Sequence, residues 1–157
     1  MKKLLHINPV LRTSTSTGRI IQEIGAVAMK EGWDNYIAYS KGRDGVKVSQ
    51  SKLVPVGSKV SVGIHGLLTR FFDMHGLGSW LATKRFVKEI GRLRPDVIHI
   101  HNIHGYFLNY KVLFDYLSKA DIPVVWTVHD CWLYTGHCYH YASVCLLYTS
   151  PSPRDAT

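Results

Sequence analysis

The fold is decided by residues 95–130, which read PDVIHIHNIHGYFLNYKVLFDYLSKADIPVVWTVHD. A short apolar run at Val97–His101 predicts a strand buried on both faces, and a polar loop follows it. The next apolar residues recur at helical spacing and predict a helix, which ends at Asp121-Ile122-Pro123. A second strand is predicted at Val124–Val128, with His129-Asp130 at its carboxyl end. Because ligands of parallel sheets collect outside the carboxyl ends of the strands, both polar segments are candidates for chemistry.

The residues before this stretch repeat the alternation of strands and helices. Lys3–Asn8 predicts a first strand, and a helix is expected from about Gly18 to Glu31, with Ser16 or Thr17 as its capping residue. Further elements are predicted at Asn35–Tyr39, Leu53–Val56 (an edge strand, because it contains proline), Lys59–Asp73 and Ser79–Arg94. Strands that alternate with helices predict an α/β fold with a doubly wound parallel sheet.

Length and composition fit one globular domain. The chain has 157 residues, enough for a core of its own, and no apolar run is long enough to span a bilayer. Met1-Lys2-Lys3 leads into only a short apolar run, so we expect no signal peptide. All three cysteines follow residue 130 and do not form a disulfide framework, which indicates a reducing, cytoplasmic environment.

The formal charge of +8 is concentrated in one segment. Lys41–Arg94 holds eleven Lys and Arg against three Asp and Glu, whereas the rest of the chain holds eight of each. This excess fits a phosphorylated small molecule, an anionic membrane surface or nucleic acid, but also a merely solvated face. The segment shows no recognised nucleic-acid-binding motif, so we expect no nucleic-acid partner. The helix at Ser79–Arg94 is expected to cover the sheet and to expose a basic face able to rest on anionic headgroups, formed by Lys84, Arg85, Lys88 and Arg92.

The loop before the first helix, Arg12–Arg19, consists mostly of Ser, Thr and Gly. A strand that leads through such a loop into a helix start is a geometry that binds phosphate, because the first amides of the helix point at the ligand. The loop lacks the three spaced glycines of a dinucleotide site and the Gly-Lys-Ser/Thr of a P-loop. It is therefore either a phosphate or sugar contact, or an ordinary capped turn.

Two groups of residues suggest a metal site. His99 and His101 point to the same face of a strand and, with His104, approach the His-x-His-x-Asp-His run of metallo-β-lactamase-like hydrolases. Ile103 replaces the aspartate, so a metal-dependent hydrolase that uses these three residues with His129 is the alternative function. The second group lacks zinc-knuckle spacing; it comprises Cys131, His137, Cys138 and Cys145.

Hydrogen bonding to a polar small molecule is the third interpretation of these residues. A sugar needs a dense set of polar side chains, because each hydroxyl both donates and accepts. The aromatic residues near His129 fit a sugar ring, although core packing is the commoner fate of such residues. The polar candidates are His101, Asn102, His104, His129 and Asp130.

The end of the chain differs from the rest. Leu146–Thr157 has neither helical nor strand periodicity, and its two X-Pro steps disfavour regular structure. It also resembles the translation of sequencing-adaptor DNA at the end of a truncated metagenomic read. We therefore predict one domain over residues 1–145 and a non-native or disordered tail over residues 146–157.

Three segments, taken in order, resemble the amino-terminal part of bacterial family-four glycosyltransferases: Ser16–Arg19, Pro95–Asn102 and Trp126–Cys138. The resemblance implies the Rossmann-like, acceptor-side half of a GT-B fold, while a second domain that this chain lacks would hold the nucleotide-sugar donor. The implied enzyme is a retaining, hexosyltransferase-type glycosyltransferase of surface polysaccharide synthesis, with a glycan or lipid-linked acceptor and no metal ion or other cofactor. It is expected in the cytoplasm, peripherally at the inner face of the cell membrane. The fragment alone is expected to be inactive.

The resemblance also implies roles for particular residues. Gly18 and its neighbours would approach the donor diphosphate, and His129 would contact the transferred sugar near its anomeric centre. In a front-face retaining mechanism the protein supplies position and electrostatic stabilisation, so His129 would orient or stabilise and would not be a nucleophile. Asp130 would either orient that histidine or cap the next helix. The catalytic candidates are thus His129 and Asp130, and the substrate-binding candidates are Ser16, Thr17, Gly18, Arg19, His101, Asn102, His104 and Gly105.

Overall fold

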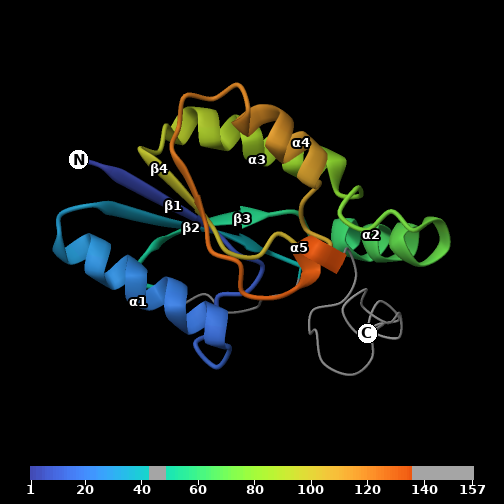
Figure 1. The fold of residues 1–157 in the computed structure, drawn as a ribbon, viewed down its shortest axis with the longest axis horizontal. Coiled ribbons are helices and arrows are strands. Elements are labelled where there is room, and N and C mark those ends of the chain that lie inside the picture. Colours follow the sequence, from blue (N-terminus) through green and yellow to red (C-terminus); the bar gives the residue numbers. More distant parts are fainter. Residues whose placement is uncertain (43–48, 136–157) are drawn as a thin grey trace, which may run out of the picture. The chain divides into compact units, whose positions relative to one another are not determined.

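The computed structural model describes residues 1–42 and 49–135, and its centre is a five-stranded parallel sheet (Figure 1). The strands are β1 (Lys3–Ile7), β2 (Asp34–Ser40), β3 (Lys52–Val56), β4 (Val97–Ile100) and β5 (Val124–Trp126). They lie in the order β3-β2-β1-β4-β5, and every neighbouring pair is parallel. The chain therefore builds the sheet outward from β1 on one side and restarts on the other side at β4, as Rossmann-like sheets do. The predicted α/β fold with a doubly wound parallel sheet is confirmed.

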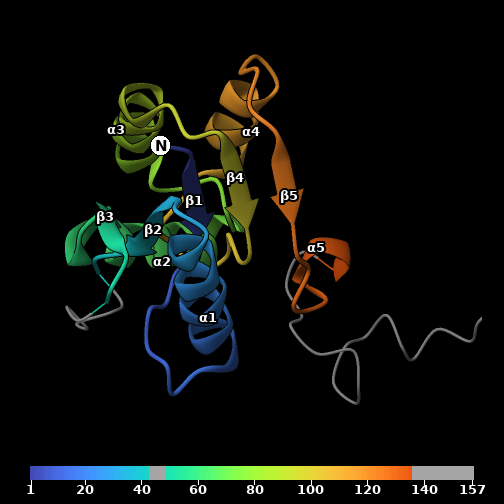
Figure 2. The same cartoon turned by 90° about the vertical axis from the view of Figure 1, so that its left-hand side faces the viewer.

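Helices cover both faces of this sheet (Figure 2). Residues 1–127 form one compact unit, whose helices are α1 (Ser16–Lys30), α2 (Lys59–Phe72), α3 (Trp80–Leu93) and α4 (Tyr110–Leu117). α1 lies on one face of the sheet, and α3 and α4 lie side by side on the other. Residues from Val128 onward belong to a second unit, which contains α5 (Trp132–Thr135).

The two faces of the sheet differ in composition. On one face the fully buried side chains of β1 and β4 are all aliphatic; they are Leu5, Ile7, Ile98 and Ile100. On the opposite face, toward α1, Ile37 of β2 packs with Ile21 of α1. His6 of β1 stands beside Ile37 in the register and pairs with His99 of β4 on its other side. The second face therefore has polar side chains at its centre, where a parallel sheet is usually apolar.

The start of the first helix differs from the prediction. Thr15, not Ser16 or Thr17, is the capping residue, since its Oγ1 accepts a hydrogen bond from Gly18 N–H at 3.2 Å. Thr15 has the extended backbone that a capping residue needs, with φ −99° and ψ 145°, whereas Ser16 is already helical. The strand predicted to end at Val128 also stops earlier, at Trp126. The predicted tail, Leu146–Thr157, lies outside the described residues, and so the domain boundary stays a prediction.

The two helices of the basic segment bury different amounts of their apolar surface. α3 behaves as predicted: Phe86 and Ile90 are buried, and the four predicted basic residues are exposed. α2 does not bury its apolar residues, and the only residue of it that is buried is His65. The large exposed side chains of α2 are Val60, Ile64, Leu67, Phe71 and Phe72. No helix within the described residues is both long and apolar enough to cross a bilayer.

Candidate functional site

β1 and β4 form the point at which the sheet reverses its connections. The chain leaves β1 for α1 on one face, and it leaves β4 for α4 on the other (Figure 2). The pairing of the two strands extends one residue past β4, because His101 N–H donates to the Ile7 carbonyl at 3.0 Å. Open α/β sheets bind ligands where such connections diverge. We call residues 8–19 and 101–106 the switch-point loops.

The first switch-point loop is a folded turn held by its own polar groups. Asn8 is fully buried, and its Nδ2 donates to the Val10 carbonyl at 2.7 Å. The Arg12 carbonyl accepts from both the amide and the hydroxyl of Thr15, at 3.1 and 2.7 Å. Within the described residues, Asn8 Oδ1 is buried and has no hydrogen-bond partner. Sequence reasoning missed Asn8, which directly follows a buried strand at the expected edge.

The four residues predicted to contact phosphate form the first turn of α1. A Cβ on Gly18 would lie 2.1 Å from the Arg12 carbonyl oxygen, so the approach of this loop to the helix already requires glycine. Arg19 is exposed and lies 4.0 Å from the Glu23 carboxylate on the next turn. The first turn places its amides at the positive end of the helix dipole, as an anion site needs. The role of Ser16, Thr17, Gly18 and Arg19 in binding stays a prediction.

The second switch-point loop alternates buried and half-buried residues. His101 and Gly105 are buried, whereas Asn102 and His104 are half-buried. The backbone turns sharply at Gly105 and Tyr106, with φ of 107° and 66°. The side chains of this loop that are half-buried are therefore those of Asn102, His104 and Tyr106, while His101 faces inward.

His101 belongs to a cluster of three imidazoles on the α1 face of the sheet. His6, His99 and His101 each offer one nitrogen, and these nitrogens all lie within 4.8 Å of one another. His6 Nδ1 is 3.1 Å from His101 Nε2, and the rings of His99 and His101 are 4.0 Å apart. Burial, with a smaller contribution from the neighbouring His99, lowers the pKa of His6 to about 3, against a hydrogen bond with the Asn35 side chain that raises it.

This cluster revises the metal alternative. His99 and His101 do share one face, as predicted, but within the described residues the third member of the group is His6, not His104. Sequence reasoning missed His6 because it lies more than ninety residues from its neighbours in the cluster. The strand register would have found it, since His6 pairs directly with His99 once β1 and β4 are adjacent.

The two catalytic candidates lie in the second unit. Asp130 Oδ1 accepts a hydrogen bond from Trp132 N–H at 3.0 Å, so its carboxylate holds the first turn of α5. This is one of the two roles expected of Asp130. Cys131 is half-buried, and Cys138 and Cys145 lie outside the described residues. Catalysis by His129 and Asp130 stays a prediction.

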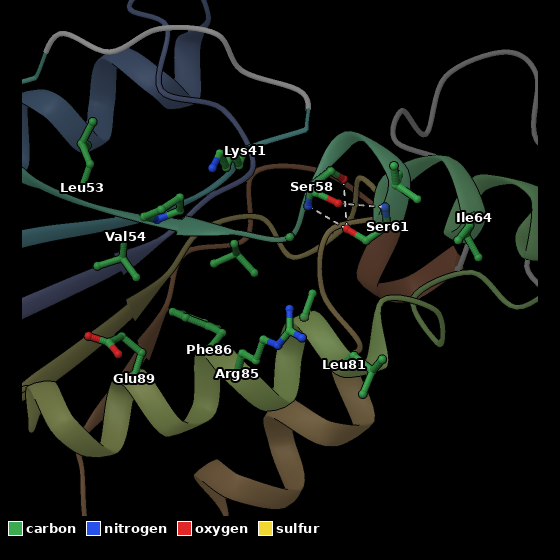
Figure 3. Close-up of a pocket in the computed structure, with 15 residues that line it drawn as sticks. Lys41, Leu53, Val54, Ser58, Ser61, Ile64, Leu81, Arg85, Phe86 and Glu89 are labelled. Atoms are coloured by element: carbon green, nitrogen blue, oxygen red, sulfur yellow. Dashed lines mark hydrogen bonds between the residues drawn. The ribbon is translucent and has the colours of Figure 1, made fainter.

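A cleft of about 620 Å³ lies between β3, the start of α2, and α3 (Figure 3). Lys41 and Arg85 bring two cations to it, and Arg85 points from α3 into the gap. Ser58 and Ser61 close the start of α2 as a capping box, each hydroxyl accepting from the other residue's amide, at 3.2 and 2.8 Å. The apolar part of the lining includes Val60, Ile64, Leu81 and Phe86. Glu89 also lines the cleft, so the lining combines apolar side chains with charges of both signs.

The sequence of this chain is similar to a known protein family and to a known bacterial protein. The sequence profile of Glycosyltransferase Family 4 matches residues 17–150. The chain is also 27% identical over 120 residues to WcaC of Escherichia coli (strain K12), whose name describes a glycosyl transferase of colanic acid biosynthesis. That alignment covers 71% of this chain and 29% of WcaC, so this chain spans less than a third of its relative.

Proposed function

The chain belongs to Glycosyltransferase Family 4, and on that premise we propose that its full-length parent transfers a sugar from a nucleotide-sugar donor to a glycan or lipid-linked acceptor. The observation that carries the proposal is the family match over a parallel sheet in the order β3-β2-β1-β4-β5, with polar loops at the switch point. The named role of WcaC supports surface polysaccharide synthesis as the setting. The proposed reaction retains the configuration of a hexosyl group.

In this proposal the residues of the chain position the substrates and stabilise the charges on them, and they form no covalent bond with the sugar. The first turn of α1, from Ser16 to Arg19, faces the donor diphosphate with the positive end of the helix dipole, since Gly18 N–H and Arg19 N–H are already bonded to Thr15. Asn102 and His104 bind hydroxyls of the acceptor, because both are half-buried polar side chains of the second switch-point loop. His129 stabilises the sugar as positive charge develops at its anomeric centre, and Asp130 fixes the chain beside it.

The first test uses the full-length parent and a panel of nucleotide sugars with lipid-linked and free glycan acceptors. Release of nucleoside diphosphate that depends on the acceptor is expected with one donor. His129→Ala should lower kcat by about 100-fold or more, the usual cost of removing one stabilising group. Lys119→Ala, an exposed change in the turn that follows α4, should leave kcat unchanged. A parent that consumes no donor in the panel would contradict the transferase proposal.

The purified 157-residue chain is proposed to be inactive, because the donor is held mainly by a domain that it lacks. Sugar transfer by this chain alone would contradict that part of the proposal.

The separate proposal that residues 1–145 form the native domain is tested by sequencing the gene from which the chain comes. An uninterrupted gene that encodes Leu146–Thr157 would show the tail to be native.

The surface of α2 and α3 is the proposed contact with an anionic membrane at the cytoplasmic face. Val60 and Ile64 of α2 stand beside Leu81 and Arg85 of α3 around one cleft, so apolar and cationic side chains share this surface. An interfacial helix pair of this kind gains from both apolar burial and attraction to acidic lipid. The segment Lys41–Arg94, which carries these helices, also holds the basic excess of the chain.

Liposome sedimentation tests the membrane contact directly. The full chain should sediment with vesicles that contain phosphatidylglycerol and much less with pure phosphatidylcholine, and added salt should weaken binding. Leu67→Gln with Phe71→Gln should reduce sedimentation, because both side chains are more than half exposed on α2, at 57% and 69%. Val27→Gln is the matched control, since Val27 is 60% exposed on α1. Equal losses in both variants, or self-association of the chain through α2 by light scattering, would contradict the proposal.

A further inference from the structure

We propose that His6, His99 and His101 form a binding site for a divalent transition-metal ion, with Zn²⁺ as the best match. The site joins β1 to β4 on the α1 face of the sheet. This inference concerns residues to which the proposed glycosyl transfer gives no chemical role, and it does not rest on that function. The argument uses the spacing of the nitrogens, the groups behind the rings and the burial of the three side chains.

The spacing of the nitrogens fits one shared ion. Zn–N bonds of about 2.0–2.1 Å in tetrahedral geometry place neighbouring ligand nitrogens about 3.3 Å apart. His6 Nδ1 and His101 Nε2 are already 3.1 Å apart, and the nitrogen of His99 lies within 4.8 Å of both. The three nitrogens are therefore close enough together to share one ion after small adjustments of the side chains. Three neutral imidazoles are a ligand set that zinc accepts, with water in the fourth position.

The groups behind the rings orient them as metal-binding histidines are usually oriented. His99 Nε2 lies 2.8 Å from Thr127 Oγ1, so a hydroxyl stands behind this ring and orients it. Behind His6, Asn35 Nδ2 donates to Ser51 Oγ at 2.8 Å, which leaves Asn35 Oδ1 to accept from the ring. A polar group that holds the second ring nitrogen of a ligand fixes its tautomer and strengthens metal binding.

The buried groups behind His6 are arranged to fix the tautomer that a metal ion on Nδ1 requires. His6 is fully buried, and its Nε2 and Asn35 Oδ1 are both buried atoms without a hydrogen-bond partner of good geometry among the described residues. Buried polar atoms are almost always paired, so this pair is poised to close by a small movement. A metal ion on Nδ1 would keep the proton on Nε2 and so complete the Nε2–H···Oδ1 hydrogen bond.

Access to the site comes through His99. His6 and His101 are 0% and 1% exposed, whereas His99 is half-buried. An ion can therefore reach the cluster from the side of His99 and then be enclosed by β1 and β4. The bound ion would tie together two strands that are far apart in the sequence, which stabilises the folded state by the binding free energy.

The experiment is a titration of the full chain, first stripped with a chelator, with zinc chloride in a calorimeter. One equivalent of zinc should bind, and the same sample should unfold at a higher temperature with zinc than without it. His99→Gln, chosen because His99 is half-buried, should abolish both effects. Thr127→Val keeps the shape of the side chain but removes the hydroxyl, and it should weaken binding by about 10-fold or more.

Two matched variants separate this site from others in the chain. His104→Gln removes a half-buried histidine outside the cluster and should leave zinc binding unchanged. Replacement of Cys131, Cys138 and Cys145 by Ser should also leave it unchanged, because the proposed ligands are imidazoles. The proposal is overturned if no zinc binds, if His99→Gln binds zinc as the unchanged chain does, or if binding disappears with the cysteines.

Discussion

Two buried histidines of this protein, His65 and His6, differ in the hydrogen-bond partners of their ring nitrogens. Both side chains are fully enclosed. His65 Nε2 accepts hydrogen bonds from Gly76 N–H and Gly78 N–H, each at 3.1 Å, and Nδ1 lies 3.1 Å from Ser79 Oγ. His6 has a protein partner on Nδ1 only. A histidine whose nitrogens pair with backbone amides and a hydroxyl is a structural residue, whereas one whose ring nitrogen faces another imidazole can share a metal ion with it.

The bonds of His65 fix its tautomer and connect two loops. Since Nε2 accepts two backbone amides, Nδ1 carries the proton and donates to Ser79 Oγ. Ser79 Oγ in turn donates to the Tyr106 carbonyl at 2.7 Å, in the second switch-point loop. His65 therefore ties the connection between α2 and α3 to the loop that follows β4.

Removal of the His65 ring should have the largest effect on stability. His65→Leu fills a similar space but leaves the amides of Gly76 and Gly78 buried without an acceptor, at about 1–3 kcal/mol each. We expect the free energy of unfolding to fall by about 3 kcal/mol or more, measured by urea denaturation. His65→Gln should recover part of the loss, because its amide oxygen can accept where Nε2 did. Equal losses in the two variants would show that these hydrogen bonds are not what holds the loop.

Substitution of Gly78, which contacts the His65 ring, should have a smaller effect on stability. A Cβ at residue 78 would lie 2.4 Å from both Cγ and Cδ2 of His65, and the three hydrogen bonds of the ring prevent it from moving aside. Gly78→Ala should therefore destabilise the protein by about 1–3 kcal/mol, the usual cost of overpacking.

Gly63→Ala is the matched control for that substitution. It stands on α2 with nothing within 4 Å of the new methyl group, and alanine is the better helix former, so it should stabilise by up to about 1 kcal/mol. Urea denaturation of both variants measures the difference. A Gly78→Ala protein as stable as the unchanged chain would mean that the His65 ring is free to shift.

The same comparison shows how far the sequence predicts this structure. Strands such as β4 were predicted correctly, because a run like Val97–His101 between a proline and a polar loop depends on local residues only. The grouping of His6 with His99 depends on which strands are neighbours in the sheet, and a local sequence pattern does not predict the strand order. Likewise, helical spacing predicts an apolar stripe on α2 but not the side to which it turns, and the structure exposes Leu67 and Phe71 while it buries His65. The rule for parallel sheets placed the candidate residues at the ends of β1 and β4, and their role in binding stays a prediction. His101 turns inward for a reason that only packing reveals.

The smallest expected effect is the dependence of stability on pH that His65 contributes. Burial is the largest cause that lowers the pKa of His65 below its ordinary value of 6.5, and the charge of His75 adds to it, against hydrogen bonds to the Tyr106 and Met74 backbone. Below about pH 6.5 the unfolded chain therefore takes up a proton that the folded His65 does not. The free energy of unfolding should fall with decreasing pH there, by at most about 1.4 kcal/mol per pH unit from this group.

The His65→Gln variant isolates that contribution, because glutamine does not titrate. Urea denaturation of both proteins between about pH 7.5 and 5.5 spans the window in which the unfolded histidine takes up its proton. The unchanged chain should lose more stability than the variant across this range, and the two slopes should agree above it, where histidine is neutral in both states. His6 is present in both proteins, so its own titration cancels in the difference. Identical slopes throughout would mean that the folded His65 accepts the proton, which its two acceptor contacts to Gly76 and Gly78 should prevent.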